Sequence, residues 1–224
     1  MSPEQPPLAR RLAAEGIGSF FLFACVIGSG IMAANLSGGN DAIALLSNTV
    51  ATGAILFVLI TILGPISGAH MNPAVSLVAA SRHELGWTDT LAYIAAQFTF
   101  GILGAWAAHR MFDLPTLELS VKARSGLGKG LSEFIATFGL IFTILGTVRY
   151  RERWVPATVG LYITAAYWFT SSTSFANPAI TVARSLTNTF AGIAPRDVPL
   201  FIVAQLLGAG CAAMAARWLF DSAE

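Results

Sequence analysis

The triplet Asn-Pro-Ala occurs twice in this chain, as Asn72-Pro73-Ala74 and as Asn177-Pro178-Ala179. Each copy follows a long apolar segment and opens a short one. Asn is a strong N-cap, because its side-chain oxygen accepts hydrogen bonds from the free N–H groups of a first helical turn. Pro suits the first helical position, where its missing N–H costs nothing. Each triplet therefore predicts a capped helix start.

The helices that the triplets open are short. They are expected to end near Ser81 and Leu186, so that each has roughly ten residues and is about 15 Å long, half of a hydrocarbon core of about 30 Å. Two half-helices that enter a membrane from opposite faces would meet at its midplane, with their positive dipole ends at one place. There Asn72 and Asn177 would offer amide donors to a passing solute.

The composition is that of a membrane protein. Of the 224 residues, 55% are hydrophobic and 11% are charged, whereas a soluble domain carries about 25% charged residues. The net charge of +1 argues against a nucleic-acid or acidic partner. Cys25 and Cys211 lie in apolar spans and are interpreted as buried hydrophobes. With no phosphate loop and no Cys/His cluster in the sequence, we expect neither a cofactor nor a metal.

The apolar pattern predicts an all-α membrane protein with six spanning helices and two re-entrant half-helices. The expected spans are 12–34, 42–63, 87–112, 131–148, 155–169 and 198–220. Residues 64–71 are expected to be irregular within the membrane, which lipid tolerates only where the backbone is shielded or lines a cavity. Residues 113–129 form the longest polar connection. A single channel domain is expected over residues 1–224.

The two halves of the chain repeat one pattern, over about 8–112 and about 127–221. Glu15 in the first span corresponds to Glu133 in the fourth. Each half has three spans, and an odd number forces the halves into opposite orientations. The sequence therefore predicts an inverted repeat with its site at the midplane. A further matching pair is Gln97 and Gln205.

On its two triplets and this repeat, the chain resembles the major intrinsic protein family, the aquaporins and aquaglyceroporins, over nearly its whole length. The resemblance implies a passive channel, a homotetramer with one pore per subunit, and cytoplasmic termini. If the N-terminus is cytoplasmic, seven Lys and Arg residues would lie inside and six outside, so these charges alone barely set the orientation. The loop Arg149–Arg153 favours a cytoplasmic N-terminus. We therefore expect a multi-pass protein of the cell (inner) membrane.

The resemblance also implies a selectivity filter, and here the chain departs from the family. The residue after the second triplet is usually Arg in the family, but it is Ile180 here. By spacing, the second-span filter position falls on Thr52 and the loop position on Ser174. The fifth-span position falls on Ala165 or on Tyr167, depending on the direction of counting. The outer end of the predicted pore thus lacks the Phe and the Arg that water-selective members of the family have there.

Such a filter predicts an aquaglyceroporin-like channel for water and small uncharged polyols such as glycerol. Similarity to bacterial members that lack the Arg adds neutral arsenite and methylated arsenicals as solutes, on the resemblance alone. A water-selective channel is the alternative. Other classes are a coupled transporter, since buried carboxylates and inverted repeats occur there too, and a closed structural member. We do not expect an enzyme, because no nucleophile–base or metal constellation stands near the midplane.

The backbone before each triplet has no regular helix to bond, and the resemblance implies that its carbonyls line the pore. The residues concerned are Gly68, Ala69 and His70, and Thr173, Ser174 and Phe175.

The ionisable groups near the midplane each allow two interpretations. Glu15 and Glu133 are either a proton relay or acceptors for the re-entrant loop of their own half. His70 either lines the pore or is a buried, satisfied histidine. Arg184 lies one helical turn after Ile180. It either adds charge at the outer vestibule or snorkels from the end of its helix.

Overall fold

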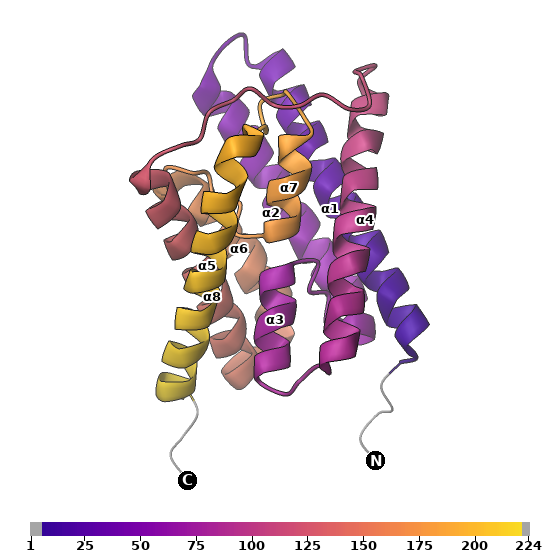
Figure 1. Cartoon of the computed structure of the whole chain (residues 1–224), viewed down its shortest axis with the longest axis vertical. Helices are drawn as coiled ribbons and strands as arrows, with labels where there is room; N and C mark the ends of the chain where they lie inside the picture. Colours follow the sequence, from indigo (N-terminus) through magenta and orange to yellow (C-terminus); the bar gives the residue numbers. More distant parts are fainter. Residues whose placement is uncertain (1–5, 221–224) are drawn as a thin grey trace.

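A computed structural model describes residues 6–220 (Figure 1). Its described part is built of helices and contains no strand. The helices are α1 Leu8–Leu36, α2 Asp41–Ser67, α3 Pro73–Ser81, α4 Trp87–Met111, α5 Leu127–Arg151, α6 Val155–Phe169, α7 Pro178–Ser185 and α8 Val198–Phe220, with 3-10 turns η1 Glu152–Trp154 and η2 Pro195–Asp197. The ends of the predicted domain, residues 1–5 and 221–224, lie outside the described residues.

The six predicted spans correspond to α1, α2, α4, α5, α6 and α8, and the half-helices to α3 and α7. By length and hydropathy, five helical stretches of the described chain suffice to cross a membrane, because α5 and α6 count as one stretch, Leu127–Phe169. The predicted irregular segment is too long at its start. Helix α2 continues through Pro65 and ends only at Ser67, where Gly68 takes a left-handed φ of 85°.

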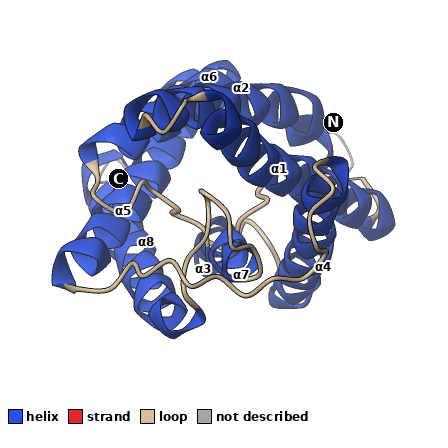
Figure 2. Cartoon of the chain, turned by 90° about the horizontal axis from the view of Figure 1, so that it is seen from above, coloured by secondary structure: helices blue, strands red, loops and turns tan. Residues whose placement is uncertain are grey.

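The six long helices form a ring that is open between α4 and α8, and α3 and α7 lie at this opening (Figure 2). Helix α1 packs against α2 and α4, while α5 packs against α6 and α8, and contact between α2 and α6 joins the halves. Glycine allows the closest crossings. A Cβ on Gly104 would lie 2.2 Å from the carbonyl oxygen of Phe20, and one on Gly208 would lie 2.3 Å from that of Phe134. These equivalent contacts of α4 with α1 and of α8 with α5 repeat the predicted internal symmetry.

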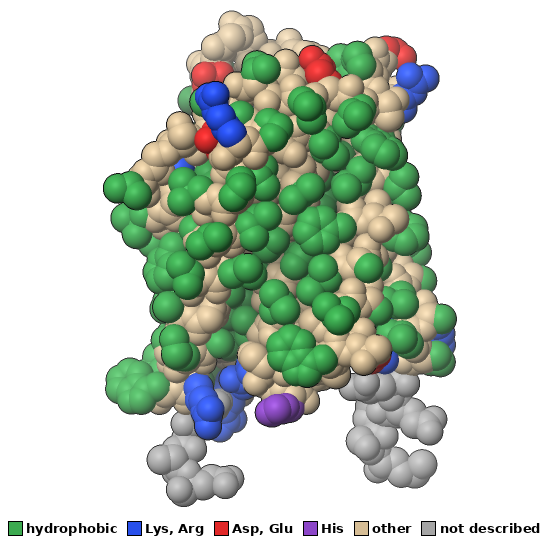
Figure 3. All heavy atoms as spheres, in the orientation of Figure 1, with side chains coloured by type: hydrophobic (Ala, Val, Ile, Leu, Met, Phe, Trp, Pro, Cys, Tyr) green, Lys and Arg blue, Asp and Glu red, His purple; other side chains and the backbone are tan. Residues whose placement is uncertain are grey.

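The two half-helices run in opposite directions from the middle of the bundle. In Figure 1, α3 runs from the centre toward the lower end, where α1 begins and α8 ends, and α7 runs toward the upper end. Hydrophobic side chains cover the middle of the face shown in Figure 3, whereas charged side chains gather near its two ends. This banded surface suits a protein that crosses a bilayer.

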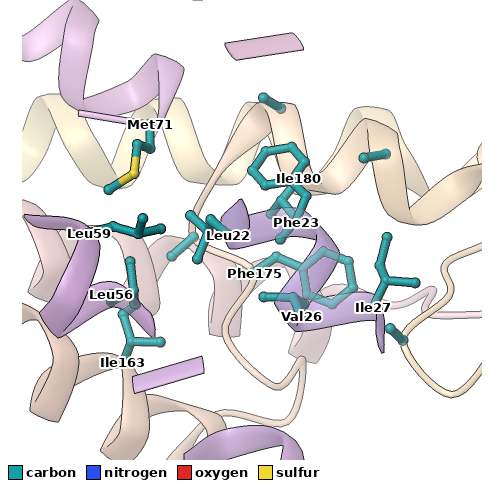
Figure 4. Packing of buried hydrophobic residues seen from close by; sticks show 14 of the residues in the cluster. Leu22, Phe23, Val26, Ile27, Leu56, Leu59, Met71, Ile163, Phe175 and Ile180 are labelled. Atoms are coloured by element: carbon teal, nitrogen blue, oxygen red, sulfur yellow. The ribbon is translucent and has the colours of Figure 1, made fainter. Parts of the chain in front are cut away.

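The core between the halves is aliphatic and aromatic. Figure 4 shows side chains from α1, α2 and α6 together with Phe175 and Ile180 of the second half. Leu22, Leu56 and Ile163 belong both to this cluster and to the wall of the central cavity. The packing of the halves and the wall of the cavity are therefore made by one set of side chains.

Candidate functional site

Each Asn of the two triplets caps its own half-helix. The side-chain oxygen of Asn72 accepts a hydrogen bond from the N–H of Ala74 at 2.9 Å. That of Asn177 accepts from Ala179 at 2.9 Å and from Ile180 at 3.2 Å. Both Asn residues have extended backbones, with a Pro at the first helical position. The caps leave each side-chain amide group, with its two N–H bonds, free to point elsewhere.

Each of those amide groups bonds to the opposite half of the chain. Nδ2 of Asn72 donates to the carbonyl oxygen of Ala176, and Nδ2 of Asn177 donates to that of Met71, both at 2.8 Å. Each acceptor immediately precedes the opposite triplet. The sequence predicts two amide groups wholly free for solute, but one N–H of each is taken by the other loop. One N–H per Asn remains.

The loops before the triplets have an unusual backbone that repeats between the halves. Ala69 and Met71 in the first loop, and Ser174 and Ala176 in the second, have φ values of 48–50°. This left-handed conformation is costly for residues other than glycine, at about 1 kcal/mol or more each. It turns successive peptide groups in alternate directions, so that carbonyls and N–H groups point to different sides. Other bonds must hold the loops in place.

Glu15 provides those bonds for the first loop. It is fully buried in α1. Its Oε1 accepts from the N–H of His70 at 2.8 Å and from the hydroxyl of Ser67 at 2.7 Å. Its Oε2 accepts from the N–H of Met71 at 2.6 Å and from the amide of Gln97 at 2.8 Å. Hydrogen bonds to a carboxylate are about twice as strong as neutral ones, which offsets the strain of the loop.

Glu133 makes the equivalent bonds in the second half. It accepts from the N–H groups of Phe175 and Ala176, each at 2.9 Å, and from the amide of Gln205 at 2.6 Å. Neither carboxylate lines the cavity. Of the two interpretations of these residues, the contacts match loop support.

Gln97 and Gln205 are site residues that the sequence reasoning missed. Gln97 bridges Glu15 to the hydroxyl of Ser76, at 3.0 Å from that oxygen. Gln205 bridges Glu133 to the hydroxyl of Thr181 in the same way, at 2.9 Å. The signal was present, because these glutamines occupy matching positions in the two repeats.

A cavity of about 800 Å³ extends through the centre of the bundle. It reaches from Arg153 at the lower end, past Asn72 and Asn177, to Arg184 in the upper half. Of the predicted carbonyl residues, all but Thr173 line it. Much of the remaining wall is aliphatic, including Leu22, Val26, Leu56, Ile60, Leu140, Ile144, Val159 and Ile163. The wall thus combines polar groups with a largely aliphatic surface.

His70 matches the pore-lining interpretation, and its side chain is half-buried. It lines the cavity, and its Nδ1 lies 3.1 Å from the hydroxyl of Ser76. Its ring also meets that of Tyr93 edge to face, with the centroids 5.5 Å apart. A histidine fixed on two sides presents a constant surface to a solute.

The predicted filter residues meet at the upper part of the cavity. Thr52, Tyr167, Ser174 and Ile180 all line it, whereas Ala165 is exposed on the outside of α6. The hydroxyls of Thr52 and Tyr167 lie 3.2 Å apart. Of the two fifth-span alternatives, the geometry favours Tyr167. The Ser174 hydroxyl is buried and has no hydrogen-bond partner among the described residues.

Arg184 turns inward. It is 2% exposed and lines the same cavity. Its Nε donates to the carbonyl oxygen of Ala191, and its guanidinium carbon lies 3.4 Å from the ring centroid of Phe175. The snorkelling interpretation does not fit, because the charged group is not at the surface. A guanidinium therefore reaches the upper cavity although Ile180 has replaced the expected Arg.

Arg124 is a second buried cation that the sequence reasoning missed. It lies in the connection between α4 and α5 and donates to the carbonyls of Gly192 and Ser172 at 2.8 and 3.0 Å. Its guanidinium carbon is 5.0 Å from the ring centroid of Phe175. Burial lowers the pKa of Arg124 to about 10. Nothing in a polar connection distinguishes this Arg from its neighbours, so the sequence carried no signal for it.

The described geometry offers no metal site, since within residues 6–220 no group of three or more His, Cys, Asp or Glu side chains comes together. Cys25 and Cys211 are both free thiols.

The chain is similar to several known proteins. A family model described as "Major intrinsic protein" matches residues 3–174. Aquaglyceroporin AqpS of Rhizobium meliloti (strain 1021) is 57% identical over 217 residues, which cover 97% of this chain and 93% of that protein. Aquaporin NIP2-1 of Zea mays is 32% identical over 198 residues, covering 84% and 65%.

A solved structure has the same fold. The X-ray structure of the aquaglyceroporin from Plasmodium falciparum superposes with a TM-score of 0.74 at 18% identity, covering 93% of this chain and 95% of that one. At this identity the likeness concerns the fold alone.

Proposed function

Because the chain belongs to the major intrinsic protein family, we propose that it is a passive channel for water and small uncharged solutes such as glycerol. The observation that carries this proposal is the cavity that passes both Asn-capped half-helix tips. Its polar groups and aliphatic wall suit a polyol, which carries hydroxyls on a carbon chain. The name of the relative AqpS supports the same class of solute.

At the midplane, a neutral solute exchanges hydrogen bonds with water for bonds to the protein. The remaining N–H groups of Asn72 and Asn177 donate to a solute oxygen, and the loop carbonyls accept from its hydroxyls. A cation meets the positive ends of α3 and α7 instead. It would also lose its hydration shell in a low-dielectric space, at great cost. The tips therefore favour neutral molecules.

In the upper cavity, four residues set the size and polarity of the proposed filter. Thr52 and Ser174 offer hydroxyls, Ile180 offers an aliphatic surface, and Tyr167 contributes a ring and a hydroxyl. Ile180 makes no bond that would orient a solute. The proposed filter thus accepts solutes larger than water. Arsenite and methylated arsenicals are further candidate solutes, because these neutral hydroxides resemble polyols in their hydrogen bonding.

A water-selective channel is the second candidate, and one observation favours it. Tyr167 and Arg184 both line the upper cavity beside Ile180, and two such large side chains would restrict the passage of solutes larger than water. A coupled transporter lacks comparable support, because Glu15 and Glu133 are occupied by loop N–H groups and do not line the cavity.

The proposed assembly is a homotetramer in the cell (inner) membrane, with one pore per subunit. The lower end in Figure 1 would face the cytoplasm, since α1 begins and α8 ends there. The loop Arg149–Arg153 lies at that end and carries three Arg residues. Its charge supports this orientation through the positive-inside rule.

The test is stopped-flow light scattering on proteoliposomes, first with an osmotic step for water and then with a glycerol gradient, followed by arsenite uptake. Protein-free liposomes give the background. Fast downhill flux of water and glycerol supports the proposed channel, and arsenite uptake adds that solute. Fast water flux without glycerol flux supports the water-selective candidate. Flux of neither, in protein that is folded and inserted, contradicts both.

A further inference from the structure

We infer that the upper end of the cavity is a binding site for a small planar oxyanion of the nitrate class, held by Arg184 and Ser174, and that an anion bound there blocks solute flux. The blocking step rests on the proposed channel function, whereas the binding site does not.

The first observation is a guanidinium with donors to spare. The Arg184 side chain donates from Nε to the carbonyl oxygen of Ala191 and interacts electrostatically with Tyr167. A guanidinium has more N–H donors than these two contacts use. Within residues 6–220, the ion pairs join Arg11 to Asp89 and Arg82 to Glu84, and none involves Arg184. The guanidinium fork matches two oxygens of one planar anion.

The second observation is the unpaired hydroxyl of Ser174. This side chain is 2% exposed, lines the same cavity and finds no partner among the described residues. Buried polar groups are normally hydrogen-bonded, and an exception calls for a bound group. Ser174 immediately precedes Phe175, and the Arg184 guanidinium lies over the ring of Phe175. The free hydroxyl and the guanidinium therefore belong to one part of the cavity.

The local charge also favours an anion. Arg124 contacts Phe175 as well, with its guanidinium carbon 5.0 Å from the ring centroid. The nearby carboxylate, Glu133, is occupied by the N–H groups of Phe175 and Ala176 and by Gln205. Two buried cations thus stand beside this space, and Glu133 pairs with neither of them at ion-pair distance.

Such an anion would stop at this site and not cross. Below the filter the wall is largely aliphatic, with Leu22, Leu56 and Ile163 among its residues. A desolvated charge in such surroundings is costly. Among the described residues, no further Lys or Arg lines the cavity between Arg184 and the Arg residues of the lower end. The site therefore holds an anion on the route that a neutral solute must use.

The experiment measures glycerol flux in proteoliposomes equilibrated on both sides with sodium nitrate or, at the same ionic strength, with sodium gluconate, whose chain of six carbons makes it far bulkier than nitrate. Nitrate stays ionised at every working pH. An ion with a dissociation constant of about 50 mM occupies the site about two thirds of the time at about 100 mM, so glycerol flux should fall about threefold.

Variants assign the effect to the site. Arg184→Gln removes the fork and should abolish the difference between nitrate and gluconate, and Ser174→Ala should weaken it. The matched control is Arg196→Gln, because Arg196 is exposed near the same end and its side chain makes no hydrogen bond or ion pair with the described residues. It should keep the full nitrate effect.

A binding measurement separates this inference from the channel proposal. Nitrate should raise the melting temperature of the purified protein relative to gluconate, since a ligand of the native state stabilises it. The rise should vanish in Arg184→Gln and persist in Arg196→Gln.

The two measurements together distinguish the site from the channel. A melting-temperature rise that depends on Arg184, in a protein without glycerol flux, would retain the site and reject the channel. Normal glycerol flux with neither nitrate block nor an Arg184-dependent rise would reject the site. An Arg184-dependent rise without any block would reject the claim that the bound anion obstructs the route.

Discussion

Asn72 and Asn177 are each bonded to the loop that precedes the other. Their Nδ2 atoms donate at 2.8 Å to the carbonyl oxygens of Ala176 and Met71, respectively, while their Oδ1 atoms cap their own half-helices. Each side chain therefore does two things, since it starts a helix and ties the two halves together. The position of one helix tip depends on the other half of the chain.

This double role predicts an unusually large cost for removing one Asn. Asn177→Ala loses two capping bonds and the bond to Met71, so the free energy of unfolding should fall by about 2–4 kcal/mol. Asn40→Ala is the matched control, because the Asn40 side chain caps the exposed start of α2 and bonds no other described residue. It should cost about 1 kcal/mol. Equal losses in detergent unfolding experiments would contradict the tie between the halves.

Much of the fold could be predicted from the sequence because membrane solubility and helix capping leave few choices. The starts of α6 and α8, at Val155 and Val198, agree with the expected spans. The end of α2 was predicted too early, at residue 63. The helix continues through Pro65 to Ser67 and stops where Gly68 takes a left-handed conformation.

The site was only partly predictable for a physical reason. The triplets and the buried carboxylates follow local rules and the internal repeat, and the filter positions follow from the family resemblance. The use of one N–H of each Asn by the opposite loop is a contact between residues more than a hundred positions apart. The insertion of Arg124 beneath the outer loops is likewise set by tertiary packing. No local pattern specifies either.

Tyr167, and not Ala165, should control the passage of glycerol. Tyr167→Ala removes a ring and hydroxyl from the cavity wall, so the ratio of glycerol to water permeability should rise by about threefold, as expected for about 0.7 kcal/mol less hindrance. Ala165→Val is the matched control, because Ala165 faces outward. Stopped-flow measurements of both variants decide the point. A change in Ala165→Val alone would reverse the assignment.

Ile180→Arg should narrow the filter against larger solutes. Ile180 is 5% exposed and lines the cavity, so a longer, charged side chain there must enter the space used by a polyol. Glycerol permeability should fall by about tenfold, which corresponds to about 1.4 kcal/mol, while water permeability is largely kept. The conservative Ile180→Val is the control and should leave both rates close to the parent values. Loss of water and glycerol in equal measure would count against the filter assignment.

Gly208 should tolerate no side chain. A Cβ there would lie 2.3 Å from the carbonyl oxygen of Phe134, which belongs to the backbone of α5 and cannot move away cheaply. Gly208→Ala should therefore lower the melting temperature, through a destabilisation of about 1–3 kcal/mol. The matched control is Gly210 on the same helix, where a Cβ would meet nothing within 4 Å. Gly210→Ala should be neutral or stabilising, by up to about 1 kcal/mol.

Lys122 should make the proposed nitrate block depend on pH. It lies in the connection between α4 and α5, and its Nζ donates to the carbonyl oxygen of Phe190 at 2.9 Å. Burial, with the charges of Arg124 and Arg184, lowers the pKa of Lys122 to about 8. A lowered lysine pKa means that the positive charge is present at pH 7 and lost as the pH rises through 8. The remaining charged groups that act on it are Asp41 and Lys129.

Between pH 7 and pH 9 the upper end of the cavity therefore loses most of one nearby positive charge, and nitrate should block glycerol flux less strongly. Because this charge lies near the surface, the dissociation constant of nitrate should rise by about twofold to threefold. Lys122→Gln should show the weaker block at both pH values. Glycerol flux in gluconate serves as the reference at each pH. A block that weakens with pH as much in Lys122→Gln as in the parent protein would assign the titration to another group.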